Sequence, residues 1–372
     1  MKVLMILTNP FTHDPRVYNE AKSLLKAGHK VTVYSWDNKK LNPENEIIDS
    51  IRVIRSFNSW FMNILPFDLM KLHLWWRKAY KELLKLFKNE KFDVVHCHDF
   101  DTLPIGVKLK KKLGVPLIYD SHEFFAYGMS RKVPFWKYYF SKEKKLLNYV
   151  DRIITVNQPL KDFFQKITKK PVSIIMNAKP LQEKKYTKPE NEIFTLFYAG
   201  TIAKPRFLLE LVDVVNDLEE VKCVIAGDGV DREYLNNLEA KSSETDKVDF
   251  IGKVTMDNVV TLTKKSDIVI CMTDPNDPNN SRATANKQFE AMVCGRPIIC
   301  TKETYPGKFT EQKKVGIIAE YTKKDLKRAI LELKNNPGIC EEYGKNALNS
   351  AIDEYNWEKQ EEKLVEIYEN II

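Results

Sequence analysis

Short apolar runs alternate with amphipathic helical segments along almost the whole chain, and this alternation constrains the fold more than any other feature. Lys2–Thr8 is a mostly apolar run without helical periodicity, as expected for a buried parallel strand. After it, Asp14 is a suitable N-cap, Pro15 stands at the first helical position and Gly28 is a natural terminator. Repeated along a chain, this order predicts βαβ units and a parallel sheet.

The same patterns predict the remaining elements. In the first half we expect strands at Lys30–Trp36, Ile51–Phe57, Phe92–His98, Pro116–Tyr119, Arg152–Val156 and Val172–Met176, and helices near 67–89, 102–113, 135–148 and 158–167. In the second half we expect strands at Phe194–Ala199, Lys222–Ala226, Val248–Ile251, Asp267–Met272, Pro297–Thr301 and Val315–Ala319, and helices near 206–216, 231–240, 257–265, 286–294, 323–335, 339–353 and 357–370.

A polar segment at residues 178–192 interrupts the alternation once. It holds two prolines and has no apolar periodicity, which is typical of an interdomain linker. Because 372 residues exceed the usual size of one core, two domains are expected. We therefore predict an α/β protein with two tandem doubly wound domains, over residues 1–178 and 193–355, joined by a linker at 179–192. Ligands of such sheets bind beyond the carboxyl ends of the strands, so two facing domains would form a cleft.

The net charge changes sign near this linker. Residues 1–185 carry 34 Lys and Arg against 18 Asp and Glu, a net charge of +16, whereas residues 186–372 carry 25 against 33, a net charge of −8. A basic half indicates an anionic partner, such as nucleic acid, a phospholipid surface or a phosphate-bearing substrate. A compositional preference for Lys is the alternative, but such a preference should not reverse its sign at mid-chain.

Aromatic residues interleave with cations in the basic half, at Trp60–Lys71, Leu74–Lys78 and Arg131–Tyr139. This pattern suits an anionic membrane surface or a lipid-linked acceptor, and its alternative is a core-facing helix with a solvated basic face. No nucleic-acid recognition motif accompanies the charge, so we expect no nucleic-acid partner. The first apolar run is too short for a signal peptide, and no stretch is long enough to span a membrane. We expect a cytoplasmic protein, peripheral on the inner face of the membrane.

Several familiar chemistries lack their motifs. The six cysteines form no C-x-x-C pair and no cluster at zinc spacing, so we interpret them as small core residues and assign no metal to them. Neither half has a G-x-G-x-x-G, a Walker A loop or a G-x-S-x-G elbow, which disfavours a dinucleotide oxidoreductase, a P-loop kinase and a serine hydrolase.

Polar clusters instead follow three predicted strands of the first domain, at Asn9–Arg16, His96–Asp101 and Asp120–Glu123. The first cluster lies beside a helix N-terminus, where an anion is favoured, although a simple cap and surface loop explain it equally well. The other two clusters are consistent with a metal site, a hydrogen-bonding sugar site or structural caps. We favour the hydrogen-bonding site, since polar tips after buried strands face the cleft.

The second domain has three corresponding segments. Tyr198–Arg206 combines a strand-end glycine with two cations beside a helix start, which suits a diphosphate. Ala226–Gly229 is better explained by plain turn chemistry. In Ala285–Pro297, Lys287 and Glu290 share one helix face and could bind phosphate and ribose, although a solvated ion pair is the simpler explanation for an isolated helix.

Taken together in order and spacing, these segments resemble the retaining nucleotide-sugar glycosyltransferases of family 4, over nearly the whole chain. The motifs that carry the resemblance are Asp14 to Val33, Phe92–His98, Asp120–Glu123, Tyr198–Thr201, Ala226–Gly229, Phe250–Gly252 and Asn286–Pro297. The resemblance implies the GT-B fold of two Rossmann-like domains, with a C-terminal helix of about residues 356–372 crossing back to the first domain. It also implies retention of anomeric configuration and no obligatory metal or other cofactor.

The resemblance places functional roles on individual residues. His122 would contact the donor sugar, Arg206 the donor diphosphate and Glu290 the ribose, while Lys287 fits the subgroup with Asn-Lys before this helix. We hypothesise that Arg206, Lys287 and the helix N-terminus stabilise charge on the leaving diphosphate. The further donor-binding candidates are Gly200, Thr201, Lys204, Gly227, Ile251, Val254, Ala285 and Asn286. The acceptor-side candidates are His13, Asp14, Arg16, His98, Asp99 and Glu123.

The chain departs from the family pattern at three places. Thr201 stands where a phosphate-binding arginine is usual, so Lys204 would substitute, and Arg282 stands where the first glutamate of a Glu-(seven residues)-Glu motif is usual. The loop Phe11–Asp14 lacks the common glycine pair. We expect transfer of a hexose-type sugar from a UDP- or GDP-sugar to a glycan or lipid-linked acceptor, in assembly of a cell-surface glycan or glycolipid. A sugar-nucleotide epimerase of the same architecture and a non-catalytic sugar-nucleotide-binding protein remain as alternatives.

Overall fold

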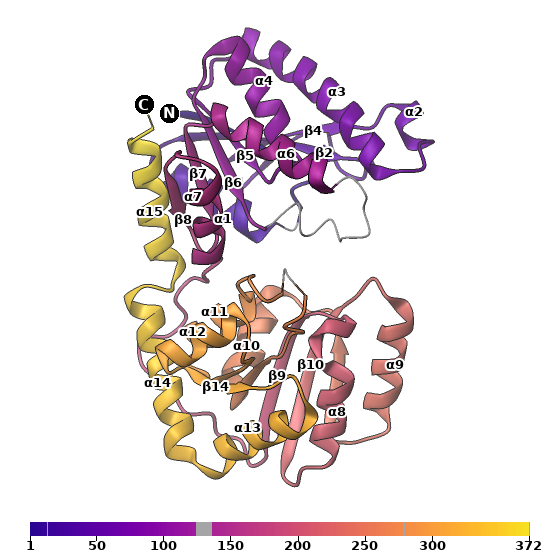
Figure 1. Ribbon diagram of the computed structural model, residues 1–372, viewed down its shortest axis with the longest axis vertical. Helices are drawn as coiled ribbons and strands as arrows, with labels where there is room; N and C mark the ends of the chain where they lie inside the picture. The colour runs from indigo at the N-terminus through magenta and orange to yellow at the C-terminus, as the bar shows by residue number, and fades with distance from the viewer. Residues whose placement is uncertain (13, 124–135, 278–279, 372) are drawn as a thin grey trace. The chain divides into compact units, whose positions relative to one another are not determined.

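The computed structural model describes residues 1–12, 14–123, 136–277 and 280–371. The chain divides into two compact units (Figure 1). The first unit comprises residues 1–175 together with residues from 361 onward, and the second unit comprises residues 176–360.

The first unit is built on a parallel sheet with one antiparallel edge strand. Eight strands among its described residues follow the order β3-β4-β2-β1-β5-β6-β7-β8, and β3 alone pairs antiparallel. The strands are β1 (Lys2–Leu7), β2 (Lys30–Asp37), β3 (Asn45–Ile48), β4 (Ile51–Phe57), β5 (Val94–His98), β6 (Leu117–Ser121), β7 (Arg152–Thr155) and β8 (Val172–Ile174). The helices are α1 (Pro15–Lys26), α2 (Trp60–Asn63), α3 (Asp68–Asn89), α4 (Leu103–Leu113), α6 (Trp136–Leu146), the 3₁₀ turn η1 (Leu147–Tyr149) and α7 (Gln158–Ile167).

The second unit has a six-stranded, fully parallel sheet within the described part of the chain, in the order β11-β10-β9-β12-β13-β14. The strands are β9 (Phe194–Thr201), β10 (Val221–Asp228), β11 (Val248–Gly252), β12 (Ile268–Cys271), β13 (Ile298–Thr301) and β14 (Gly316–Ala319). The helices are the 3₁₀ turn η2 (Lys204–Arg206), α8 (Leu208–Asn216), α9 (Arg232–Ser243), α10 (Met256–Lys265), α11 (Asn286–Val293), α12 (Tyr305–Lys313), α13 (Lys323–Asn335) and α14 (Pro337–Asp353). Helix α15 (Trp357–Glu369) starts in the second unit, and from residue 361 onward it belongs to the first.

The apolar strands and helix stripes form the cores that the sequence predicts. The central strand β1 is buried from Val3 to Leu7, and α1 packs on the strands β2 and β4 and buries Val17, Ala21 and Leu24. The Asp14 carboxylate accepts a hydrogen bond from the Val17 N–H at 3.1 Å, which confirms the predicted cap. Two parallel α/β sheets confirm the predicted fold class.

Three short elements were not predicted from the sequence patterns. Strand β3 reaches β4 through Asp49 and Ser50, which both have positive φ without the usual Asn-Gly signal of such a hairpin turn. Helix α2 is a single turn. Helix α12 contains a Pro-Gly pair that normally indicates a break, but the Thr304 hydroxyl caps it by accepting from the Gly307 N–H at 3.1 Å.

The segment expected to be a linker packs on the second unit. Lys179 forms a parallel β-bridge with Asn356, and the Arg296 guanidinium donates to the Thr187 carbonyl at 2.8 Å. The Tyr186 ring lies so close to Gly344 that a Cβ there would approach it to 2.6 Å. Residues 178–192 are therefore part of the second unit's surface.

The six cysteines are free thiols, five of them buried and Cys340 half-buried, which confirms their interpretation as core residues. Over the described ranges, no helix is long and apolar enough to cross a membrane.

Candidate functional site

The carboxyl ends of β9 and β10 approach each other closely, and glycines make this approach feasible. Gly200 and Gly227 have φ of 148° and 153°. A Cβ on Gly227 would lie 1.9 Å from the Gly200 carbonyl oxygen, and a Cβ on Gly229 would lie 2.1 Å from the Ile202 carbonyl oxygen. The Ala226–Gly229 segment therefore does more than form a turn, because only glycine allows the two strand ends to pack backbone against backbone.

Lys287 lies in the first turn of α11 and points toward the end of β9. Its Nζ lies 4.5 Å from the centre of the Tyr198 ring, and a Cβ on Gly200 would be 3.3 Å from the same nitrogen. Tyr198 donates its hydroxyl hydrogen to the Thr201 carbonyl at 2.7 Å, which fixes the ring beneath the ammonium group. Within the described ranges Lys287 has no carboxylate partner, so its charge remains uncompensated.

Glu290 follows one turn later on α11 and is 7% exposed. Its Oε1 lies 3.3 Å from the Nζ of Lys179. The simple Lys287–Glu290 surface pair is therefore not formed, since each side chain has a different neighbour. Lys179 is not among the predicted site residues, because the polar, proline-containing segment around it indicates only a linker.

Two further cations follow β9. Lys204 is exposed and Arg206 half-buried in η2, and Phe207, with φ of 60°, separates this turn from α8. The predicted helix start at residue 206 is therefore two residues early. The loop is tied to the segment after β12, because the Asp274 N–H donates to the Pro205 carbonyl at 2.9 Å. Neither Lys204 nor Arg206 forms an ion pair with any described residue.

The buried Cys271 thiol lies at the end of β12, on the same edge of the sheet. A hydrogen bond with Cys300, together with the positive charges of Lys287 and Arg206, lowers the pKa of Cys271 to about 7 against the effect of burial. The negative charge of Glu290 raises the same pKa. Three predicted site residues thus act on one thiol at the carboxyl edge of the second sheet.

The other donor-side candidates surround this edge. Thr201, Ile251, Arg282 and Asn286 are exposed, while Ala285 is half-buried as the N-cap of α11 without a side-chain cap bond. Val254 packs on Phe197 and Ala199, beside the end of β9. Among the described residues, no side chain caps the N-terminal N–H groups of α11, so this helix end suits an anion.

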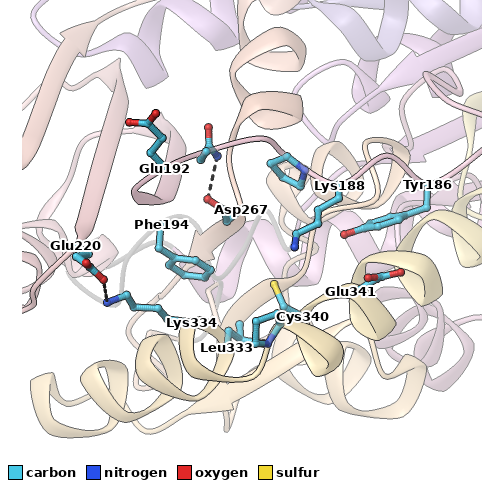
Figure 2. Close-up of a pocket in the computed structure, with 13 residues that line it drawn as sticks. Tyr186, Lys188, Glu192, Phe194, Glu220, Asp267, Leu333, Lys334, Cys340 and Glu341 are labelled. Carbon is cyan, nitrogen blue, oxygen red and sulfur yellow. Dashed lines mark hydrogen bonds and ion pairs between the residues drawn. The ribbon is translucent and has the colours of Figure 1, made fainter.

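A cavity of about 230 Å³ lies at the opposite edge of the second sheet (Figure 2). Its lining includes Phe194 at the start of β9, together with Glu220 and Asp267 just before β10 and β12. It is therefore separate from the strand ends that carry Lys287 and Arg206.

In the first unit, a buried charge network joins α1 to the end of β6. The Arg16 guanidinium donates two-pronged to the Asp120 carboxylate, with the shortest distance 2.9 Å, and its Nη1 donates to the Ile175 carbonyl at 2.9 Å. Glu20 lies one helical turn further, 3.1 Å from Arg16, but burial raises the pKa of Glu20 to about 8 although Arg16 opposes this. Asp120 therefore carries most of the charge that balances Arg16.

His122 is held by two carboxylates. Its Nε2 lies 3.1 Å from Asp120 Oδ2, its Nδ1 lies 3.2 Å from Asp99 Oδ2, and its backbone N–H donates to Asp99 Oδ1 at 2.9 Å. Burial lowers the pKa of His122, but Asp99 and Asp120 outweigh it and raise that pKa well above its ordinary value. His122 is thus an imidazolium at neutral pH, with both ring nitrogens engaged.

Two further histidines lie beneath His122. Burial lowers the pKa of both His96 and His98, so they are neutral, and His96 Nδ1 lies 2.7 Å from the Tyr368 hydroxyl of α15. Ligand atoms of His96, His98, Glu20 and Asp120 lie within 4.8 Å of one another, a spacing that could suit a metal ion. Arg16 already supplies positive charge to both carboxylates, so the group fits a compensated structural network better than a cation site.

Several acceptor-side candidates are buried or engaged in other contacts. Arg16 and His98 are 7% and 2% exposed and face the buried network, so the predicted acceptor contact does not suit them. The Asp14 carboxylate is engaged in capping α1 and in a bond from Asn9. Asp99 is half-buried with φ of 59°, and Glu123 is exposed. His13 lies outside the described residues.

Two parallel α/β units, with cations and a carboxylate gathered beyond the strand ends of the second, define a protein of the GT-B class. Comparison with known families agrees: Glycosyltransferase Family 4 matches residues 16–182, and Glycosyl transferases group 1 matches residues 178–350. The chain therefore belongs to glycosyltransferase family 4 and is a glycosyltransferase.

Among relatives, an uncharacterised glycosyltransferase of Methanocaldococcus jannaschii is 24% identical over 295 residues, or 79% of this chain and 80% of that protein. The alpha-monoglucosyldiacylglycerol synthase of Streptococcus pneumoniae is 24% identical over 360 residues, or 86% of this chain and 76% of that protein.

Solved structures show the same fold. Sucrose-phosphate synthase from Thermosynechococcus elongatus superposes with a TM-score of 0.78 at 15% identity, over 99% of this chain and 98% of that one. The Anabaena protein HepE in complex with UDP-glucose has a TM-score of 0.74 at 14% identity, over 99% of both chains.

Proposed function

We propose that the protein transfers a hexose-type sugar, with retention and without an obligatory metal ion, from a UDP- or GDP-sugar to a glycan or lipid-linked acceptor. The reaction would serve the assembly of a cell-surface glycan or glycolipid, with the enzyme on the cytoplasmic face of the membrane. The single observation that carries the proposal is the carboxyl edge of the second sheet, where the Lys287 ammonium group lies beside the backbone of Gly200 and Glu290 follows one turn later on the same helix.

The donor diphosphate would bind against the ends of β9 and β10. Gly200 exposes its backbone there, so a phosphate can approach closely, and the Lys287 ammonium lies beside it. Lys204, Arg206 and the N-terminus of α11 supply further positive potential. When the sugar leaves, negative charge grows on the diphosphate, and these preorganised groups would stabilise it more strongly than the ground state.

Glu290 would bind the ribose hydroxyls. One of its oxygens lies 3.3 Å from the Lys179 ammonium group, which orients the carboxylate, and the other remains available as an acceptor. The base would lie along Ile251 near the end of β11 and Val254 just after it. UDP-glucose bound to HepE and the lipid product in the name of the pneumococcal relative support a UDP-sugar donor and a lipid acceptor.

His122 would act on the donor sugar through its charge. With both ring nitrogens paired to carboxylates, it offers a fixed imidazolium rather than a free hydrogen-bond donor. We therefore propose that Asp99 and Asp120 hold the His122 imidazolium in position beside the donor sugar.

Thermal stabilisation against UDP-, GDP-, ADP- and CMP-sugars and their free nucleotides tests the donor, since a ligand at about 100 times its Kd stabilises by about 2.7 kcal/mol. We expect one nucleotide class to shift the melting temperature, with the shift lost in Glu290→Gln and kept in Lys302→Gln, which alters an exposed ion pair elsewhere. Absence of a shift with every nucleotide would contradict the proposal.

Product analysis then separates the alternatives. A transferase releases nucleoside diphosphate in the presence of acceptor, whereas an epimerase converts the donor sugar without releasing it. A non-catalytic binding protein would show stabilisation by the donor but neither product.

A further inference from the structure

Large apolar side chains gather on the surface around α2 and the first turn of α3. Five of them lie between residues 60 and 70, with exposed fractions of 78, 41, 73, 65 and 46%: Trp60, Phe61, Ile64, Phe67 and Met70. Only Met62 of α2 is buried, so this one-turn helix contributes little to the core. We call these five side chains the apolar wedge. Single exposed apolar residues are ordinary, but five of them within eleven consecutive residues indicate an interaction surface.

The helices beside the wedge carry a strong excess of positive charge. Helices α3, α4 and α6 pack in one layer of the first unit, and α2 extends from the N-terminal end of α3 (Figure 1). Together the three helices hold 14 Lys and Arg but only three acidic residues. One of the three, Glu143, is buried.

From this combination we infer that the apolar wedge inserts into the interfacial region of an anionic phospholipid bilayer, while the cations of α3, α4 and α6 face the lipid headgroups. Aromatic and branched apolar side chains gain free energy at the boundary between headgroups and acyl chains, and basic residues nearby gain from the negative surface potential. This inference deepens the proposed function, because it would place the enzyme where a lipid-linked acceptor resides.

Two other occupants fit the surface less well. Nucleic acid would use the cations, but it gives no reason for Trp60, Ile64 and Phe67 to remain exposed. A second copy docked symmetrically through the wedge would bring the same basic helices toward each other, and like charges oppose such an interface. An anionic bilayer satisfies both the apolar and the basic component.

Vesicle co-sedimentation tests the inference. The full-length protein is mixed at low salt with phosphatidylcholine vesicles that contain phosphatidylglycerol, and with pure phosphatidylcholine vesicles. We expect binding to the mixed vesicles to fall at least about tenfold in the triple variant Trp60→Ser, Ile64→Ser, Phe67→Ser. A matched triple variant, Leu41→Ser, Ile47→Ser, Val230→Ser, removes equally exposed apolar side chains elsewhere and should bind as the wild type does.

Fluorescence locates the inserted residue. Trp60 is the most exposed of the large side chains in the wedge, so brominated acyl chains should quench it, and most of that quenching should disappear in Trp60→Phe. Equal vesicle binding by the wedge variant and the wild type would overturn the inference. A wild-type protein that sediments equally with both vesicle types, or whose wedge drives dimerisation in solution, would overturn it as well.

Measuring donor binding distinguishes membrane insertion of the wedge from the proposed transferase function. The wedge variant should be stabilised by the nucleotide-sugar to the same degree as the wild type, because the wedge belongs to the first unit and Glu290 to the second. Loss of vesicle binding with donor stabilisation intact supports the wedge alone, whereas vesicle binding without any donor stabilisation leaves the wedge standing and contradicts the proposed function.

Discussion

The two sheets end in polar groups of opposite character. Beyond the strands of the first unit, the positive charges of Arg16 and His122 are balanced by Asp120 and Asp99 in a largely buried network. Beyond the strands of the second unit, Arg206 and Lys287 have no carboxylate partner among the described residues. The opposite charges at the first edge are therefore paired with one another, and they position side chains. The second edge leaves positive charge unmatched, as a site for an anionic substrate requires.

The largest expected effect is a loss of stability when Asp120 is removed from the buried charge network of the first unit. Asp120→Asn would leave the buried Arg16 charge without its main partner, so we expect a loss of about 3–5 kcal/mol in the free energy of unfolding. Urea denaturation measures this loss. The exposed-pair variant Lys302→Gln should change stability by less than about 1 kcal/mol, and an equally small change in Asp120→Asn would show that the network is not the compensated unit described here.

Removing a cation from the carboxyl edge of the second sheet should lower activity and leave stability nearly unchanged. Arg206→Ala and Lys287→Ala each remove charge that would stabilise the leaving diphosphate, so we expect kcat to fall by about 10²–10³ with unfolding free energy nearly unchanged. Steady-state kinetics and urea denaturation of the same samples check both halves of the statement. Near-normal turnover in Arg206→Ala would remove the electrostatic part of the mechanism.

The glycine contact between β9 and β10 should be sensitive to one methyl group. In Gly227→Ala the new Cβ would collide with the Gly200 carbonyl, and φ of 153° is unsuited to alanine. We expect about 1–3 kcal/mol lower stability and weaker stabilisation by the nucleotide-sugar. Gly338→Ala, where a Cβ would meet nothing within 4 Å, should not be destabilised, and the opposite order of the two variants would contradict this account.

The first-unit network should also give stability a dependence on pH. The pKa of His122 is raised on folding, so its contribution is fully present below about 6.5, the unfolded value, and is lost as pH rises through the folded pKa. Above pH 6.5 the wild type should therefore lose up to about 1.4 kcal/mol per pH unit relative to His122→Gln. The pKa of Asp120 is lowered, so its contribution disappears only in acid. If the melting temperatures of the wild type and His122→Gln change in parallel from pH 6 to 9, the raised pKa of His122 is contradicted.

Sequence patterns were sufficient for the main elements. Residues 51–57 form a strand with the predicted bounds, and the helix at 158–167 is also found where its pattern indicates, because both have a clear apolar periodicity and end signals. Strand β3 and helix α12 were missed, since their formation depends on a hairpin turn without glycine and on a cap that overrides a Pro-Gly pair.

The candidate site divides in the same way. The motifs around Lys287, Glu290 and His122 are local, so their residue types and spacing are readable along the chain. Partners distant in sequence are not: Asp99 contacts His122 from the end of the neighbouring strand, Lys179 reaches Glu290 from a segment that looked like a linker, and Tyr368 meets His96 across 272 residues. Glu20 is the exception, because its place one helical turn after Arg16 could have shown the pairing.

Hydrophobic periodicity, glycines and caps act within a few residues, which is why they alone were enough to establish a two-unit parallel α/β chain with a basic first half. Charge state and accessibility depend on every group packed nearby, so only the tertiary structure revealed that Arg16 is buried, that His122 carries a proton and that the Trp60 side chain faces solvent.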